Sequence, residues 1–160
     1  MAHQASRRQF LKTTAATGVG YWVAAGAAAK ESKSPNEQIA MASVGIGGKG
    51  SSDSRDAGAS GRMVAICDTD QNRLKGAGKR FEGAAMYTDF RKMLDEMGDR
   101  IDAVTVSTPD HTHAPAGLMA MRMGKHCFCQ KPMTRTIYEA RLMGKVAREQ
   151  KVATQMGNQG

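Results

Sequence analysis

The stretch from Ile39 to Asp68 constrains the fold of this chain more than any other. It begins with an apolar run of strand length, Ile39–Val44, and continues with a glycine-rich turn and a segment of small residues. A second apolar run then leads to Asp68. Strand, turn, helix and strand in this order make a βαβ unit, in which the two strands pair in parallel. The sequence therefore predicts an α/β fold.

The turn after the first strand has the glycine spacing of a dinucleotide site. Gly45, Gly47 and Gly50 match G-x-G-x-x-G: the first glycine allows a tight turn, the second lets the backbone approach a pyrophosphate, and the third lets helix pack on strand. The helix N-terminus offers N–H groups to the phosphates. Asp68, about 20 residues on, can accept hydrogen bonds from both ribose hydroxyls. With 18 glycines in the chain, a chance glycine-rich turn is the alternative.

From Ile39 onward, strand-like and helix-like segments alternate along the chain. Strands are expected near residues 39–44, 63–67, 85–88, 102–107, 126–129 and 152–156, and helices near 50–58, 70–81, 89–97, 111–123 and 134–150. This alternation requires parallel pairing with right-handed crossovers, and so predicts a doubly wound parallel sheet of six strands.

Apolar side chains predict which faces of the helices are buried. The first helix offers only Ala57 and Ala59, so we expect it to be short or frayed, with Asp53 near a bound pyrophosphate. The fourth and fifth helices each have one apolar face, made of Ala114, Leu118 and Met121 and of Tyr138, Leu142 and Val146.

Residues 1–29 resemble a twin-arginine export signal. Ser6–Lys12 matches the pattern Ser/Thr-Arg-Arg-x-Phe-Leu-Lys at every fixed position, and the three alanines at 27–29 supply a small-residue cleavage site. The apolar segment between them is too short and too weakly hydrophobic for a membrane span. We expect residues 30–38 to be a linker and the protein to be exported to the periplasm or cell envelope. An uncleaved membrane anchor and a tail without signal function are the alternatives.

Charge and cysteine content argue against several classes of function. The formal net charge is +8, but the basic residues are interspersed rather than clustered, so no nucleic-acid partner is expected. Cys127 and Cys129 alternate in one strand and would point to the same face, which does not suit a disulfide, so all three cysteines are expected to be buried free thiols. His111 and His113 have no carboxylate cluster near them, and no metal site is predicted.

Two later loops are expected at the carboxyl edge of the same sheet, where ligands of doubly wound folds bind. Thr108–Ala114 follows the fourth strand, and either Thr108 or Asp110 could cap the next helix. Gln130–Pro132 follows the fifth strand. A lysine there, Lys131, is expected to be half-desolvated, which can bring its pKa toward values useful for acid–base chemistry. Simple helix capping and an ordinary surface lysine are the alternatives.

Taken in order, these motifs are similar to the N-terminal half of oxidoreductases of the Gfo/Idh/MocA family, relatives of glucose-fructose oxidoreductase and inositol dehydrogenase. The resemblance spans about residues 37–160 and includes Tyr87–Arg91 and the terminal Gly157-Asn158-Gln159. It implies a Rossmann domain over residues 39–160 that binds NAD, with NADP disfavoured by the negative charge of Asp68. It also implies a sugar or polyol substrate.

The resemblance also implies roles for individual residues. Lys131 would be the acid–base residue that helps to deprotonate a sugar hydroxyl. The cofactor would be bound by Gly45, Gly47, Gly48, Lys49, Gly50, Asp68, Thr108, Pro109, His113, Gln130 and Asn158, with Gln159 near the nicotinamide or substrate.

Two features depart from the family pattern. The usual Glu-Lys-Pro is Gln130-Lys131-Pro132 here, so the lysine lacks a neighbouring carboxylate. The sequence stops at Gly160, before the second, α+β domain that supplies a catalytic histidine, substrate contacts and the oligomer interface. A truncated product that binds nucleotide without turnover is therefore one expectation, and a homo-oligomer is expected only with that domain. An NAD-dependent glycosidase of the same family and an S-adenosylmethionine methyltransferase are further alternatives.

Overall fold

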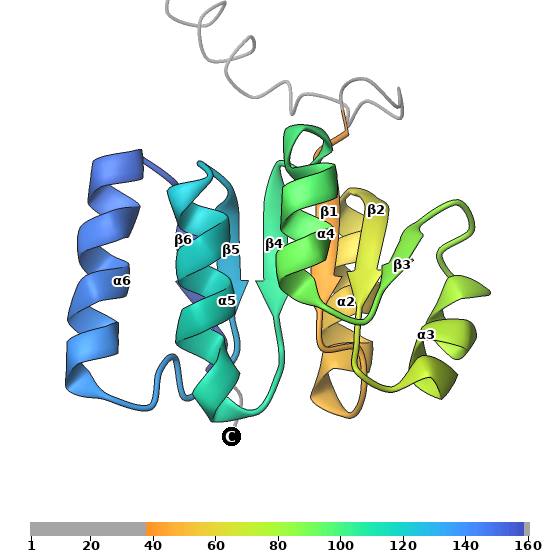
Figure 1. The fold of residues 1–160 in the computed structure, drawn as a ribbon, viewed down its shortest axis with the longest axis horizontal. Coiled ribbons are helices and arrows are strands. Elements are labelled where there is room, and N and C mark those ends of the chain that lie inside the picture. The colour runs from red at the N-terminus through yellow and green to blue at the C-terminus, as the bar shows by residue number, and fades with distance from the viewer. Residues whose placement is uncertain (1–37, 159–160) are drawn as a thin grey trace, which may run out of the picture. The chain divides into compact units, whose positions relative to one another are not determined.

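The computed structural model describes residues 38–158, which form a parallel six-stranded sheet covered by helices (Figure 1). The signal segment 1–29, all of the expected linker except Gln38, and Gln159 lie outside the described residues. The strand order is β3-β2-β1-β4-β5-β6, and every neighbouring pair is parallel. This confirms the doubly wound α/β fold.

The strands and helices follow the expected alternation. The strands are β1 (Ala40–Val44), β2 (Arg62–Cys67), β3 (Ala85–Tyr87), β4 (Ala103–Val106), β5 (His126–Cys129) and β6 (Thr154–Met156). The helices are α2 (Lys49–Ser60), α3 (Gln71–Gly78), α4 (Phe90–Met97), the 3₁₀ turn η1 (Gly98–Arg100), α5 (Asp110–Arg122) and α6 (Ile137–Gln150). Within residues 38–158, no helix is long and apolar enough to cross a membrane.

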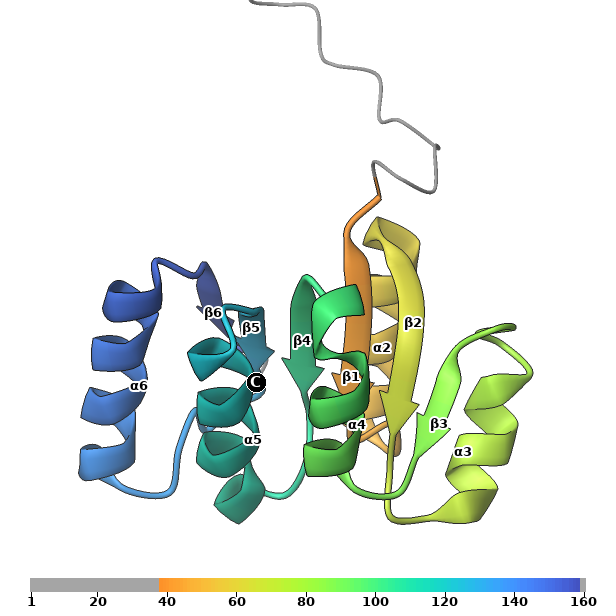
Figure 2. The same ribbon diagram turned by 45° about the horizontal axis from the view of Figure 1, so that its top comes forward.

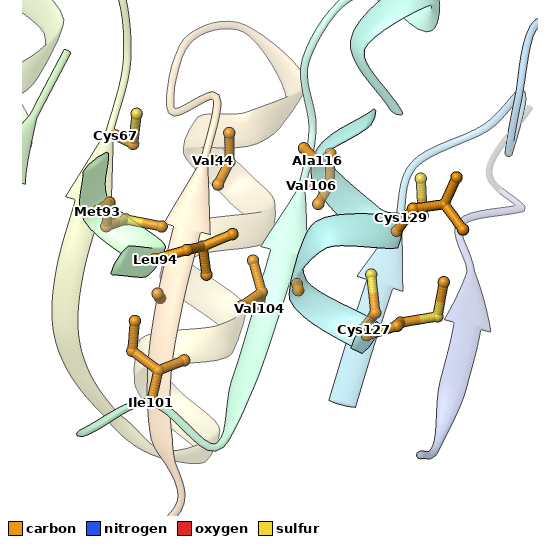
Figure 3. Packing of buried hydrophobic residues seen from close by; sticks show 14 of the residues in the cluster. Val44, Cys67, Met93, Leu94, Ile101, Val104, Val106, Ala116, Cys127 and Cys129 are labelled. Atoms are coloured by element: carbon orange, nitrogen blue, oxygen red, sulfur yellow. The ribbon is translucent and has the colours of Figure 1, made fainter. Parts of the chain in front are cut away.

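Two apolar clusters cover the two faces of the sheet. The larger one lies between the sheet and helices α4, α5 and α6, which stand side by side in both ribbon views (Figures 1 and 2). Figure 3 shows its centre, where Leu94 of α4 meets Val104 of β4. The smaller cluster packs α2 and α3 on the opposite face and includes Ile66 and Leu74. Because both faces are covered, the inner strands β1, β2 and β4 are buried along most of their length, whereas the edge strand β6 is exposed.

The cysteines confirm the expectation of buried free thiols. Cys127 and Cys129 point from β5 into the larger cluster, as Figure 3 shows, and Cys67 lies at the end of β2. Burial raises the pKa of each thiol to about 12, with nearby carboxylates adding to the effect at Cys67. These thiols therefore remain neutral at physiological pH.

Helix α2 is longer than its sequence suggests. It runs for 12 residues, and its buried line consists of Gly50, Asp53, Ser54 and Ala57, whereas Ala59 is exposed. The expectation of a short or frayed helix was wrong, because small and polar residues at helical spacing replace the missing apolar face. Small side chains let this helix lie close to the sheet.

Three other local expectations were wrong. Tyr138 is 74% exposed, because at about 100° per residue it lies roughly 140° around α6 from buried Met143. The last helix was expected near residues 134–150, but α6 begins at Ile137, because Thr136 and Glu139 form a capping box there. Neither Thr108 nor Asp110 caps α5: the N-cap is Pro109, which has no side-chain donor or acceptor for the purpose.

Candidate functional site

A cleft of about 920 Å³ opens at the carboxyl edge of the sheet. It lies where the chain order reverses, between β1 and β4, which is the position at which doubly wound sheets bind ligands. Its lining comes from the ends of β1 to β5 and the loops that follow them, and its size suits a small-molecule site. The expected convergence of the two later loops with the glycine turn is thus present.

The glycine turn brings the backbone of β1 against the backbone of the loop after β4. Gly45 has a φ of 81°, and a Cβ on it would lie 2.6 Å from the carbonyl oxygen of Ser107. The Gly45 N–H donates to the Cys67 carbonyl at 2.8 Å, which fastens the turn to the end of β2. Only glycine fits this position without displacing the neighbouring backbone.

The N-terminus of α2 opens toward the cleft. Its N-cap is Gly48, which has a φ of 52°, no capping side chain, and no neighbouring atom within 4 Å of the place that a Cβ would take. Lys49 follows and lines the cleft with a side chain that is 44% exposed. Although the Gly50 and Ser51 N–H groups donate to the Gly47 and Gly48 carbonyls, the helix dipole and the Lys49 ammonium group favour a bound phosphate at this end of α2. Gly50 does not line the cleft, since its Cα packs against the Gly45 carbonyl.

Asp68 follows β2 and is nearly buried, with 8% of its surface exposed. Its Oδ2 accepts the Ile46 N–H at 3.0 Å, and its Oδ1 accepts the Asp70 N–H at 2.9 Å. These bonds fix the carboxylate at the cleft wall, next to the glycine turn. Each oxygen has a second lone pair available for a hydroxyl donor.

Arg73 of α3 lies over the glycine turn, which sequence reasoning missed. A Cβ at Gly47 would lie 2.6 Å from the guanidinium carbon of Arg73. Nη1 of Arg73 is 3.9 Å from Asp68, and its Nε is 3.5 Å from Asp70. The sequence gives no reason to single out an exposed arginine on a polar helix, apart from its position soon after Asp68.

The wall beside β3 is formed by Thr88, Asp89, Phe90 and Arg91. The Asp89 carboxylate accepts from Nε and Nη2 of Arg91 at 2.9 and 2.8 Å, and these hydrogen bonds hold its pKa below the usual range. The Arg91 guanidinium also lies 5.7 Å from the Phe90 ring centroid. The sequence pattern marked this segment as a family landmark but gave it no role.

The loop after β4 contributes Thr108 and Pro109 to the cleft lining, and the first turn of α5 contributes His111. His113 does not line the cleft: it is 1% exposed, and its Nδ1 and Nε2 lie 2.6 and 2.7 Å from the carbonyl oxygens of Pro132 and Thr108. Its ring therefore joins the loop after β4 to the loop after β5. His113 supports these loops from inside and does not belong to their surface.

The loop after β5 places Gln130 and Lys131 in the cleft wall. Lys131 is exposed, so the expectation of a half-desolvated lysine was wrong; its loop projects beyond the sheet edge into the open cleft. Gln130 is 5% exposed, and its Nε2 donates to Oδ2 of Asp53 at 2.8 Å. Asp53 is itself turned inward and does not line the cleft, in contrast to the expected place beside a pyrophosphate.

Most residues predicted to hold the cofactor or act in catalysis meet in this one cleft. Its lining includes Gly45, Gly47, Gly48, Lys49, Asp68, Thr108, Pro109, Gln130 and Lys131. Gly50, His113 and exposed Asn158 are outside the lining. Within the described part of the chain, no group of three or more histidine, cysteine or acidic side chains is placed to hold a metal ion.

Fold and cleft together define a dinucleotide-binding domain of the Rossmann class. The strand order 3-2-1-4-5-6, the tight glycine turn after β1 and the fixed carboxylate after β2 are the features that fit such a ligand. Residues 38–158 match the sequence profile of the Gfo/Idh/MocA oxidoreductase family, described as having an NAD-binding Rossmann fold. The chain belongs to this family, and its cofactor is NAD.

The chain is similar to several characterised family members. It is 35% identical over 111 residues to inositol 2-dehydrogenase from Rubrobacter xylanophilus, a match that covers 66% of this chain and 30% of that protein. It is 34% identical over 106 residues to glycosyl hydrolase family 109 protein 1 from a Shewanella species, covering 60% and 23% respectively.

Among solved structures, the crystal structure of GenD2 from gentamicin A biosynthesis, in complex with NAD, superimposes with a TM-score of 0.68 at 26% identity. That match covers 75% of this chain and 34% of the GenD2 chain. The chain therefore spans only about a third of the length of the relatives that it matches. It represents the NAD-binding oxidoreductase domain of a family that includes sugar and polyol dehydrogenases.

Proposed function

We propose that this chain is the NAD-binding part of an exported dehydrogenase that oxidises a CH–OH group of a sugar or polyol. The observation that carries the proposal is the cleft itself, which the N-terminus of α2, the Asp68 carboxylate and exposed Lys131 line together. The similarity to inositol 2-dehydrogenase supports a polyol or sugar as the substrate class.

Each group in the cleft has a defined part in the proposal. The N-terminus of α2 and Lys49 bind the pyrophosphate, and Asp68 accepts hydrogen bonds from the ribose hydroxyls. When bound, NAD supplies the acceptor for the hydride that leaves the substrate carbon. Lys131 takes the hydroxyl proton of the substrate, since its side chain reaches into the open cleft.

The charge of Asp68 also bears on the choice between NAD and NADP. A 2′-phosphate on the ribose would meet this fixed carboxylate at the cleft wall, and like charges at contact distance are unfavourable. Arg73 lies close enough to Asp68 to offset part of that repulsion, but its guanidinium is also shared with Asp70. We therefore expect NADH to bind more tightly than NADPH.

A thermal-shift titration of the full chain tests the cofactor class. NADH is expected to raise the unfolding temperature at lower concentration than NADPH, because ligand bound only to the folded state stabilises it. S-adenosylmethionine is expected to have no effect. A shift with S-adenosylmethionine and none with NADH would overturn the proposal in favour of a methyltransferase.

An NAD-dependent glycosidase is a second candidate, favoured by the similarity to a family 109 glycosyl hydrolase. Both candidates use the same cleft and cofactor, so they differ in their products. Net NADH formation from a polyol would support the dehydrogenase. Release of a sugar from a glycoside without net NADH formation would support the glycosidase.

The N-terminal sequence supports export by the twin-arginine route. Ser6–Lys12 matches the signal pattern, and this route carries folded proteins, which suits a protein that collects its cofactor in the cytoplasm. Fractionation of a bacterium that expresses the chain should find it in the periplasm. Replacing Arg7 and Arg8 with lysine should keep it in the cytoplasm, and unchanged export would refute this part of the proposal.

A further inference from the structure

Asp53 is a buried carboxylate that the binding of cofactor does not explain. It lies on α2 with 8% of its surface exposed, and it points away from the cleft toward the ends of β4 and β5. Burial raises its pKa, but hydrogen bonds from Lys49, Gln130 and Ser107 outweigh this effect and hold the pKa below its usual value. Asp53 is therefore ionised at neutral pH.

The two oxygens of Asp53 serve different parts of the cleft. Oδ1 is 2.8 Å from the ammonium of Lys49 at the start of α2. Oδ2 accepts from the Ser107 hydroxyl at 2.7 Å and from Nε2 of Gln130 at 2.8 Å. A single carboxylate thus joins the helix that faces the phosphate site to the loops after β4 and β5.

Gln130 carries this connection on to the lysine. Its Oε1 accepts the backbone N–H of Lys131 at 2.7 Å, while its Nε2 donates to Asp53. An ionised carboxylate only accepts and a backbone N–H only donates, so these two partners fix the amide in one orientation. Gly157 leaves room for it, since a Cβ at that position would overlap Oε1 of Gln130.

The neutral side chain at position 130 matches the charged one at position 53. A glutamate in place of Gln130 would set two carboxylates against each other at the present distance of 2.8 Å, in a site with little solvent. Two carboxylates at such a distance cannot both be ionised without a large cost. The departure from Glu-Lys-Pro at this position is therefore balanced by Asp53 on α2.

We propose that Asp53 is a positioning residue for Lys131, acting through Gln130, and that Asp53 and Gln130 form one matched pair of acceptor and donor. The inference rests on the role proposed above for Lys131. In this arrangement the carboxylate that supports Lys131 comes from α2. In the Glu-Lys-Pro pattern it comes from the residue directly before the lysine. The pair orders the backbone of Lys131 and leaves its side chain in the cleft.

Exchanging the two side chains tests the pairing. Asp53→Ala removes the acceptor for Gln130, and Gln130→Glu leaves two acceptors facing each other, so each single variant breaks the link. In the double variant Asp53→Asn/Gln130→Glu, the new asparagine donates to the new glutamate, whose other oxygen accepts the Lys131 N–H. Asp56→Asn, an exposed position on the same helix, is the control for loss of charge.

The readout is hydrogen exchange of the Lys131 amide in the full chain, measured relative to the amide of Val104 in the core of β4. Loss of one net hydrogen bond should accelerate the Lys131 amide roughly 2- to 13-fold in each single variant. General destabilisation would accelerate both amides alike, so the ratio isolates the local link. The double variant should restore the ratio toward that of the unaltered chain, and Asp56→Asn should leave it unchanged.

The outcomes separate this inference from the proposed function. If both single variants leave the exchange ratio as it is in Asp56→Asn, or if the double variant is no slower than the single variants, the pairing is refuted. NADH affinity of the unaltered chain is measured in parallel. Absence of NADH binding would refute the proposed function without touching the exchange result, whereas NADH binding with no exchange effect would refute the positioning role alone.

Discussion

Replacing Gly45 with alanine should destabilise the domain strongly, because two separate effects act at this position. The residue has a φ of 81°, and its Cβ would lie 2.6 Å from the Ser107 carbonyl oxygen and 3.0 Å from the Thr108 nitrogen. Both neighbours are backbone atoms, so they cannot turn aside as a flexible side chain would. The turn after β1 would have to move away from the loop after β4.

The two effects can be assigned separate magnitudes. A side chain in the left-handed region costs about 1–2 kcal/mol. Forcing a methyl group into a close-packed contact costs about 1–3 kcal/mol more. We therefore expect Gly45→Ala to lower the free energy of unfolding by about 2–5 kcal/mol. That is a large share of the stability of an ordinary domain.

Two other glycines provide matched controls. Gly124, which follows α5, also has a positive φ, of 75°, but nothing lies within 4 Å of its added Cβ, so Gly124→Ala should cost only the about 1–2 kcal/mol of the left-handed backbone. Gly76 lies inside α3 with open space around it, and Gly76→Ala should stabilise the domain by about 0.5–1 kcal/mol.

Urea unfolding followed by circular dichroism measures all three variants, provided that the slope with denaturant stays constant. The reasoning requires Gly45→Ala to be clearly less stable than Gly124→Ala. If the two differed by less than about 0.5 kcal/mol, which is the usual scatter of neutral surface changes, the close approach of the two loops would be wrong.

Four further predictions concern the cleft and the core. Lys131→Met should slow the reduction of NAD by a polyol about 100-fold or more in a form of the protein that has activity, without a change in NADH affinity. Lys75→Met on α3 is the control, and full activity of Lys131→Met would exclude the lysine from catalysis. His113→Ala should cost roughly 2–4 kcal/mol of unfolding free energy, because it creates a cavity and removes the ring that lies between the Pro132 and Thr108 carbonyls, whereas exposed His111→Ala should be neutral. The buried thiols should not react with a disulfide reagent at pH 8 until the chain unfolds, and reaction in the folded state would contradict their burial. Since folding raises their pKa from 9.0 to about 12, their neutral form favours the folded state below pH 9, and stability measured by urea unfolding should fall as pH rises from about 9 toward about 12.

The order of strands and helices was predictable because each buried strand is a short apolar run between polar turns. Ile39–Val44 and the run that ends at Cys67 show this pattern without ambiguity. The carboxyl edge of a parallel sheet then brings the following loops together, whatever their separation in sequence. For this reason the glycine turn, Asp68 and Lys131 could be assigned to one site before any distance was known.

The errors arise where burial depends on partners far away in sequence. Asp53 was expected near a bound pyrophosphate, yet it is buried and turned away from the cleft, because Ser107 and Gln130 supply hydrogen bonds to it from the loops after β4 and β5. Lys131 was expected to be half-desolvated from its place after a strand, but the loop after β5 projects it into an open cleft. No periodicity in the sequence contains this information.

Arg73 shows a further limit of the same kind. Its position on a polar helix gave no reason to single it out, because exposed arginines are common on such helices. Only the three-dimensional structure shows that its guanidinium covers Gly47 and approaches Asp68. The sequence therefore predicted the glycine turn, Asp68 and Lys131 as parts of the cleft, but not Arg73.

The affinity of the full chain for NADH, with and without Asp68, tests the central claim most directly. Isothermal titration should show one bound NADH per chain, and Asp68→Ala should weaken binding at least about tenfold, since hydrogen bonds to a charged acceptor contribute about 1.5–3 kcal/mol each. Asp95→Ala, an exposed change on α4, should leave the dissociation constant unaltered. Equal affinity of the unaltered chain and Asp68→Ala would contradict the assignment of the cleft as the NAD site.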